Sequence, residues 1–161
     1  MTTVVSDTSP INYLCVIGAV DVLSKLFTEV LIPPMVLAEL RHPRAPQQVE
    51  EWLAHMPGWV IVRPPLSIRS DLGLDPGETE AISLALELSI PAIVIDEKRG
   101  RLAAEKCGIS AVGTLNILEA ADSHGFLNFD DAVARLRRTN FHMDDALIDA
   151  LIAKIRARKG A

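Results

Sequence analysis

The chain is 161 residues long, which is typical of one domain, and we expect residues 1–161 to fold as such. Its 49% content of hydrophobic residues excludes an intrinsically disordered chain, and no apolar run reaches the roughly 20 residues of a membrane-spanning helix. The formal net charge of −5 argues against a general nucleic-acid-binding surface unless basic residues gather locally. The first residues lack the pattern of a signal peptide, so we expect a cytoplasmic protein with no membrane partner. Cys15 and Cys107 are expected to be reduced residues of the core.

Hydrophobic periodicity predicts strands that alternate with helices along the chain. Strands are expected at 3–7, 29–32, 59–62, 92–95 and 110–112. Helices are expected at 10–18, 20–27, 35–40, 46–55, 78–88, 101–107, 114–123, 129–138 and 144–158. Ser9 is expected to cap the first helix, and residues 126–161 are expected to supply C-terminal helices. Such alternation indicates the α/β class with a parallel sheet.

Two of the expected strands end in an aspartate. Thr3-Val4-Val5-Ser6 leads into Asp7, and Ile93-Val94-Ile95 leads into Asp96. In open parallel sheets, ligands bind outside the carboxyl ends of the strands. We therefore expect Asp7 and Asp96 to lie at one functional edge, provided that the first and fourth strands are neighbours. The alternative for each is an ordinary turn-forming or helix-capping role.

Two glutamates are expected to join these aspartates. Glu39 lies in the last turn of a helix, and Glu78 lies at the start of another, where it could instead compensate the helix dipole. Glu80 and Glu97 are alternatives for the same roles. Four carboxylates repel one another unless a cation lies between them, and Mg²⁺ or Mn²⁺ prefers such oxygen ligands. An ion held in this way suits phosphodiester hydrolysis, because it activates water and stabilises developing charge.

Basic residues flank the acidic positions. Lys98, Arg99 and Arg101 follow Asp96 directly and are expected to hold a phosphate backbone, with Arg101 as the best candidate; a solvated surface is the alternative. His142 lies far along the chain from the carboxylates, so we do not expect it to be a metal ligand.

Four stretches together resemble the PIN domain and are similar to the VapC-like toxins. They are Val5-Ser6-Asp7-Thr8-Ser9-Pro10, Pro33-Pro34-Met35-Val36-Leu37-Ala38-Glu39-Leu40, Pro76-Gly77-Glu78-Thr79-Glu80-Ala81-Ile82 and Ile95-Asp96-Glu97-Lys98-Arg99-Gly100-Arg101. The likeness is greatest to a prokaryotic PIN-like branch with "GE-x-EAI" and "DE-x-x-GR" patterns. It implies a three-layer α/β/α sandwich with a central parallel sheet, and a Mg²⁺- or Mn²⁺-dependent ribonuclease.

The resemblance also assigns residues and partners. Asp7, Glu39 and Asp96 match the acidic residues of the family, and Ser9 matches a hydroxyl near the first aspartate. The third acidic position, usually Asp in the family, is here either Glu78 or Glu80. The resemblance further implies an RNA substrate, a cognate antitoxin and a homodimer.

The sequence thus predicts a metal-dependent endoribonuclease, the toxin of a toxin–antitoxin pair. The alternative is a PIN-like module that binds RNA or protein without cleaving it, because some branches of the family have no demonstrated nuclease activity. A phosphoryl-accepting receiver is disfavoured, since paired acids after the first strand and a late lysine are not evident. A haloacid-dehalogenase-type phosphatase is disfavoured because Ser9 stands where a second aspartate is needed.

Overall fold

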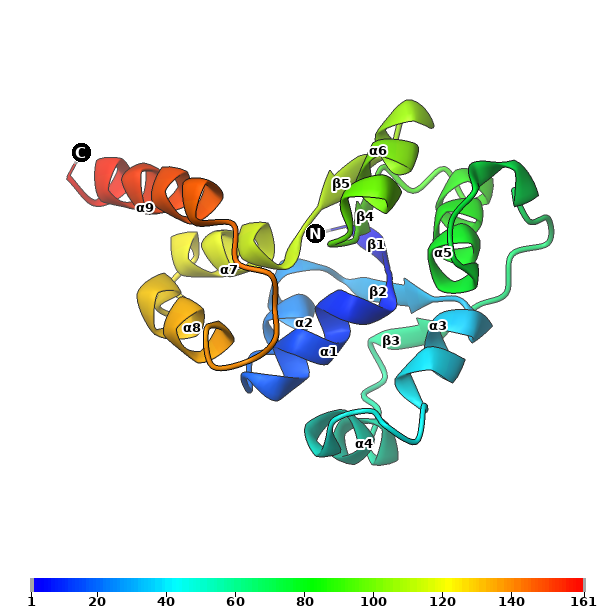
Figure 1. The fold of residues 1–161 in the computed structure, drawn as a ribbon, viewed down its shortest axis with the longest axis horizontal. Coiled ribbons are helices and arrows are strands. Elements are labelled where there is room, and N and C mark those ends of the chain that lie inside the picture. Colours follow the sequence, from blue (N-terminus) through cyan, green and yellow to red (C-terminus); the bar gives the residue numbers. More distant parts are fainter. Residues whose placement is uncertain (1, 161) are drawn as a thin grey trace.

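A parallel sheet of five strands forms the centre of the computed structural model, which describes residues 2–160 (Figure 1). The strands are β1 (Thr3–Ser6), β2 (Glu29–Ile32), β3 (Val60–Val62), β4 (Ala92–Val94) and β5 (Ser110–Val112). Each corresponds to a strand expected from the sequence.

Nine α-helices connect and follow the strands in the described part of the chain. They are α1 (Thr8–Val16), α2 (Val22–Leu26), α3 (Pro34–Leu40), α4 (Gln47–Ala54), α5 (Pro76–Glu87), α6 (Lys98–Lys106), α7 (Thr114–Ser123), α8 (Phe129–Leu136) and α9 (Asp145–Lys159). A short 3₁₀ helix, η1 (Ser70–Leu72), lies between β3 and α5. The largest difference from expectation is at α6, which begins three residues early, so that Lys98 and Arg99 are helical. None of these helices has the length and apolar character needed to cross a bilayer.

The strand order is β3-β2-β1-β4-β5. The chain adds β2 and β3 on one side of β1, and then adds β4 and β5 on the other side. These two strands pair in parallel, with Val5 opposite Ile93 and Ser6 opposite Val94. The residues that follow β1 and β4 therefore leave the sheet side by side. The condition for Asp7 and Asp96 to share one edge is met, and this edge is where open α/β sheets bind ligands.

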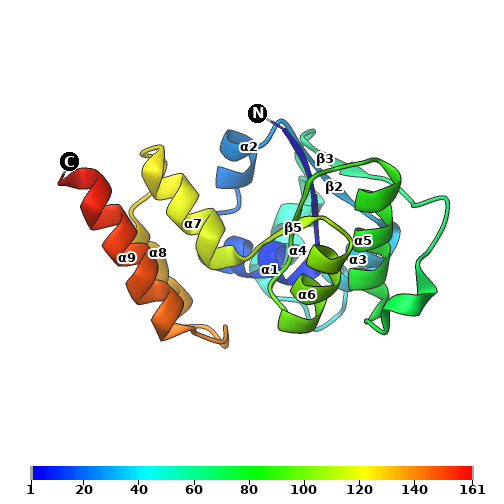
Figure 2. The ribbon, with the colours of Figure 1, turned by 90° about the horizontal axis from the view of Figure 1, so that it is seen from above.

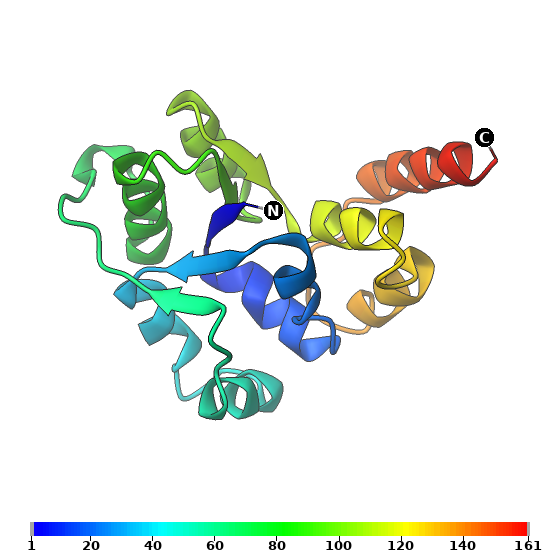
Figure 3. The ribbon, with the colours of Figure 1, turned by 180° about the vertical axis from the view of Figure 1, so that it is seen from behind.

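Alternating strand residues face two separate hydrophobic layers. Val4 and Val30 pack with residues of α1, α3 and α7, whereas Val5, Leu31 and Ile93 pack with α5 and α6. In Figures 1 and 3, α5 and α6 (green) lie on one side of the sheet, and α1 to α4 (blue to teal) lie on the other. Burial on both faces explains why the strands read as continuous apolar runs. The predicted α/β/α sandwich is confirmed.

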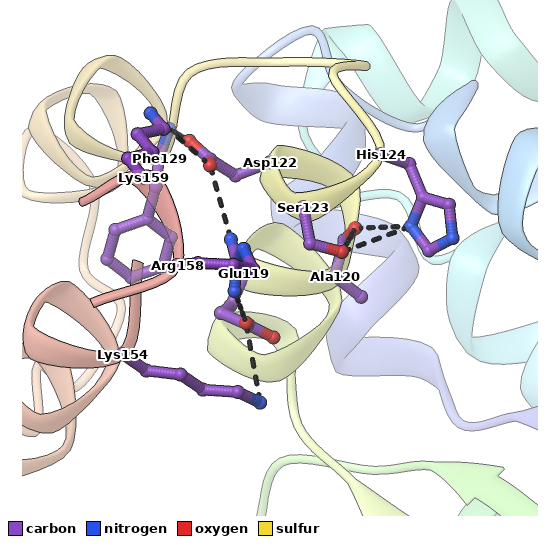
Figure 4. Close-up of polar contacts among 9 residues, drawn as sticks. All are labelled: Glu119, Ala120, Asp122, Ser123, His124, Phe129, Lys154, Arg158 and Lys159. Atoms are coloured by element: carbon purple, nitrogen blue, oxygen red, sulfur yellow. Dashed lines mark hydrogen bonds and ion pairs between the residues drawn. The ribbon is translucent and has the colours of Figure 1, made fainter. Parts of the chain in front are cut away.

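The last three helices lie together at one end of the molecule (Figure 2). On α7, Glu119 and Asp122 are only 7% and 8% exposed. Arg158 of α9 donates to Glu119 Oε1 over 2.7 Å and lies 3.5 Å from Asp122 Oδ1, while Lys154 and Lys159 form longer ion pairs with the same two acids (Figure 4). Because buried carboxylates are costly when unpaired, these contacts fasten α9 to α7.

We expect Arg158→Ala to destabilise the protein, because Glu119 then loses its shortest charged partner. The free energy of unfolding should fall by about 1 to 2 kcal/mol, since Arg158 is partly solvated. Urea unfolding followed by circular dichroism measures this change. Arg156→Ala is the matched control, since Arg156 makes no ion pair among residues 2–160. Equal stability of the two variants would contradict this role.

Candidate active site

A cavity of about 690 Å³ opens at the carboxyl ends of β1 and β4. Its walls come from the start of α1, the end of α3, the residues between β4 and α6, the start of α7 and the chain that joins α8 to α9. The acidic side chains in its walls are Asp7, Glu39, Asp75, Asp96, Glu97 and Asp144. We call this cavity the carboxylate pocket. Three of the four predicted acidic residues therefore meet in one cavity.

Asp7 follows β1 directly, and its N–H donates to the carbonyl of Val94 over 2.9 Å. It occupies the N-cap position of α1 but makes no side-chain capping hydrogen bond. The prediction that Ser9 caps this helix is wrong, because α1 already begins at Thr8. Burial, together with the nearby carboxylates of Glu39, Asp75 and Asp96, raises the pKa of Asp7 to about 7, although a hydrogen bond from the Thr8 backbone opposes the rise. Asp7 lies between β1 and α1, but because its side chain makes no capping hydrogen bond, the carboxylate is available to a ligand.

Glu39 reaches the pocket from the last turn of α3. Its Oε2 accepts a hydrogen bond from Thr8 Oγ1. A β-carbon at position 77 would collide with the Glu39 carboxylate, so a larger residue there would force this carboxylate to move. Burial also raises the pKa of Glu39 above its ordinary value. Thr8 and Gly77 therefore fix where this carboxylate lies.

Asp96 is held by the start of α7. The backbone N–H of Thr114 donates to Asp96 Oδ1 over 2.7 Å, and the Thr114 hydroxyl donates to Oδ2 over 2.8 Å. The Ser9 hydroxyl lies 3.4 Å from the same Oδ2, so the structure places Ser9 on the second aspartate. Burial raises the pKa of Asp96, and the hydrogen bonds from Thr114 and Ser9 oppose that rise. The carboxylate is held in one orientation by three donors.

Glu78 lies behind the pocket wall, where it is 4% exposed. Its Oε2 is buried and has no hydrogen-bond partner among the described residues, and a β-carbon at position 100 would collide with it. One carboxylate oxygen each from Glu78, Asp75 and Glu97 lie within 4.8 Å of one another. Burial is the main cause that raises the pKa of Glu78, with Asp75 the next. Glu78 is therefore a buried, unsatisfied carboxylate beside two wall residues.

Glu80 has a different environment. Its Oε1 accepts a hydrogen bond from the backbone N–H of Met35 over 3.2 Å, at the start of α3. This contact satisfies one of the unpaired N–H groups of that helix and links α5 to α3. Of the two candidates for the third acidic position, Glu78 is thus the one with a buried, unpartnered carboxylate oxygen.

The predicted phosphate-binding residues separate into two groups. Lys98 and Arg101 line the carboxylate pocket, whereas Arg99 does not and donates to the carbonyl of Gly73 over 2.9 Å. The Nε of Arg101 is buried with no partner among residues 2–160. Arg101 therefore offers an unused donor to an anion in the pocket.

Several wall residues were missed from the sequence. Asp75 caps α5 by accepting from the Glu78 N–H over 2.9 Å and also reaches the pocket. Asn12 lies one turn after Thr8, and helical spacing would have placed the two on one face. His142 lies in the same walls, although it is distant in sequence. Nothing local in the sequence points to that last contact.

The side chains present suit a hard divalent cation. Their ligand atoms are carboxylate oxygens, which Mg²⁺ and Mn²⁺ prefer. The buried, unpartnered oxygen of Glu78 and the raised pKa of Asp7 both indicate that this cluster lacks a compensating positive charge. Of the four residues predicted to hold such an ion, Asp7, Glu39 and Asp96 line the pocket and Glu78 lies behind its wall, in the group whose oxygens come within 4.8 Å of one another.

Two of three comparisons with known proteins found a similar family or structure. A family model, DUF3368, described as a PIN domain, matches residues 3–157. A solved PilT N-terminus domain protein from the hyperthermophilic archaeon Sulfolobus solfataricus P2 is similar, with 17% identity and a TM-score of 0.47 over 89% of this chain and 100% of that one. No curated protein matches this sequence.

We expect the metal-free protein to lose stability as pH rises. Asp7 keeps its proton in the folded chain up to about pH 7, whereas the unfolded chain releases it near its ordinary pKa of 3.8. Between about pH 5 and about pH 7 this difference should cost about 2 kcal/mol of stability. Thermal and urea unfolding in a chelator at several pH values measure it. Asp7→Asn should flatten the slope; stability that rises with pH in this range would contradict the assignment.

The two glutamates of α5 should differ in metal binding. Glu78→Gln should weaken Mn²⁺ binding at least about tenfold, because a buried carboxylate beside the pocket is neutralised. Glu80→Gln should leave it within about twofold, because its amide oxygen can still accept from Met35. Isothermal titration with Mn²⁺ makes the comparison, and the reverse order would show that Glu80 is the ligand.

Proposed function

The chain belongs to the PIN-domain family DUF3368, and we propose that it is a Mg²⁺- or Mn²⁺-dependent endoribonuclease. PIN domains are generally nucleases and usually bind divalent metals. The observation that carries the proposal is the gathering of Asp7, Glu39 and Asp96 in one cavity, with Arg101 in the same wall. Carboxylates beside an unpaired guanidinium donor suit an ion and a phosphate at once.

Asp7, Glu39, Glu78 and Asp96 would hold the ion in this proposal. A bound Mg²⁺ or Mn²⁺ would supply Lewis acidity, lower the pKa of water and offset the charge that develops on the phosphate. The chain contributes a prearranged ligand set. Thr114 fixes Asp96, and Thr8 fixes Glu39, so little reorganisation is needed when the ion and substrate bind.

Lys98 and Arg101 would position the RNA backbone. Both line the pocket, and the buried Nε of Arg101 has no partner within the described chain. A guanidinium can donate two parallel hydrogen bonds to a phosphate, which fixes the orientation of the scissile group as well as binding it. Arg99, engaged with Gly73, would act only at the margin of the bound strand.

A PIN-like module that binds RNA or protein without cleavage is the second candidate. It would use the same pocket and differs only in turnover. The role as a toxin, the cognate antitoxin and the homodimer remain predictions from the resemblance of the sequence. The cytoplasmic location remains a prediction from the first residues of the chain.

Asp7→Asn and Asp96→Asn should each reduce Mn²⁺-dependent RNA cleavage by at least about 100-fold, because each removes a charge from the ligand set while keeping its shape. Cleavage of a labelled RNA pool on denaturing gels measures the loss. Glu105→Gln, an exposed acid on α6, is the control and should cut like the unchanged protein. Full activity in both aspartate variants would exclude the mechanism, and an inactive unchanged protein that still binds RNA would favour the binding module.

A further inference from the structure

We propose that Asn12, with the segment from Thr139 to Asp144, forms a nucleotide-binding wall of the carboxylate pocket. The wall would hold the sugar and base next to the phosphate that lies among the carboxylates. This inference rests on the proposed ribonuclease function and adds substrate-contacting residues to it. It gives the C-terminal chain a part in substrate binding.

Asn12 carries the strongest observation. It lines the pocket from α1, and its Oδ1 is buried with no hydrogen-bond partner in the part of the chain that the structure describes. Buried polar atoms are nearly always paired, so this acceptor at the pocket wall lacks a donor that water or a ligand would supply. RNA offers such donors in its 2′-hydroxyl groups and in the exocyclic amines of its bases.

The segment between α8 and α9 is docked against α1 beside Asn12. The Tyr13 hydroxyl donates to Asn140 Oδ1 over 2.8 Å, and the rings of Tyr13 and Phe141 meet edge to face with centroids 4.9 Å apart. These contacts hold the next residue, His142, in the pocket wall although its side chain is exposed. An exposed imidazole in that place can stack on a base or hydrogen-bond to its edge.

The chemistry of the two walls is complementary to one nucleotide. Arg101 brings an unpaired donor suited to a phosphate, while Asn12 brings an unpaired acceptor and His142 an aromatic ring. The volume of about 690 Å³ is in the range of cavities that enclose small ligands, so an unpaired nucleotide fits, whereas a base in a duplex would first have to leave its stack. The wall therefore favours an unpaired strand over a base-paired one.

Binding of labelled RNA to the full chain tests the wall. The probes are a fluorescein-labelled mixed-sequence RNA 12-mer and its blunt duplex, measured by fluorescence anisotropy in Ca²⁺, with gels to verify that the RNA stays intact. Asn12→Ala and His142→Ala should each weaken binding of the single strand about tenfold, which corresponds to about 1.4 kcal/mol. His124→Ala is the matched control, because this exposed histidine stacks on Phe126 outside the pocket.

The outcomes separate this inference from the proposed function. The proposed nucleotide-binding wall would be overturned by any of three results. These are binding by both variants that equals that of the unchanged protein, equal affinity for the single strand and the duplex, and no binding of either probe. If Asn12→Ala is unfolded by circular dichroism, His142→Ala decides, since an exposed side chain can be truncated without loss of core packing. Cleavage is measured separately in Mn²⁺. Failure of the unchanged protein to cut, with binding still lost in the variants, would overturn only the ribonuclease proposal.

Discussion

The structure depends on the acidic side chains that lie between β1 and β4, where the order in which the strands are added to the sheet reverses. Asp7 and Asp96 leave neighbouring strands at the same edge, and Glu39 approaches from a third element. Removing these carboxylates from water and bringing them together disfavours their charged forms, which is why burial raises the pKa of each. A fold bears such a cost where the cluster has a use, and a divalent cation is the kind of partner that would offset it.

Small and polar neighbours make the cluster possible. Gly77 and Gly100 leave room for the carboxylates of Glu39 and Glu78, and no side chain fits at either position without collision. Thr114 supplies two donors that orient Asp96. These residues determine where the carboxylate oxygens lie. The acidic side chains are thus held in place by neighbouring residues that are not themselves predicted metal ligands.

Much of this arrangement follows from local sequence pattern. Apolar runs predict the strands, and the residue after each run is then expected at the edge of the sheet. Asp7 and Asp96 could therefore be found without a structure. The prediction that Ser9 caps α1 took Pro10 as the first helical residue, but α1 begins at Thr8. Proline is tolerated anywhere in the first turn of a helix, where its missing N–H is not needed, so Pro10 does not mark the start. The pocket contacts of His142 were beyond prediction because they depend on how the α8–α9 segment docks on Tyr13.

The most direct test of the account is the anomalous diffraction of a crystal soaked in Mn²⁺. The account predicts an anomalous peak in the carboxylate pocket, within coordination distance of oxygens from Asp7, Glu39 and Asp96. A peak elsewhere, or an ordered pocket with no peak at saturating Mn²⁺, would contradict the claim that these carboxylates are gathered to hold a divalent cation.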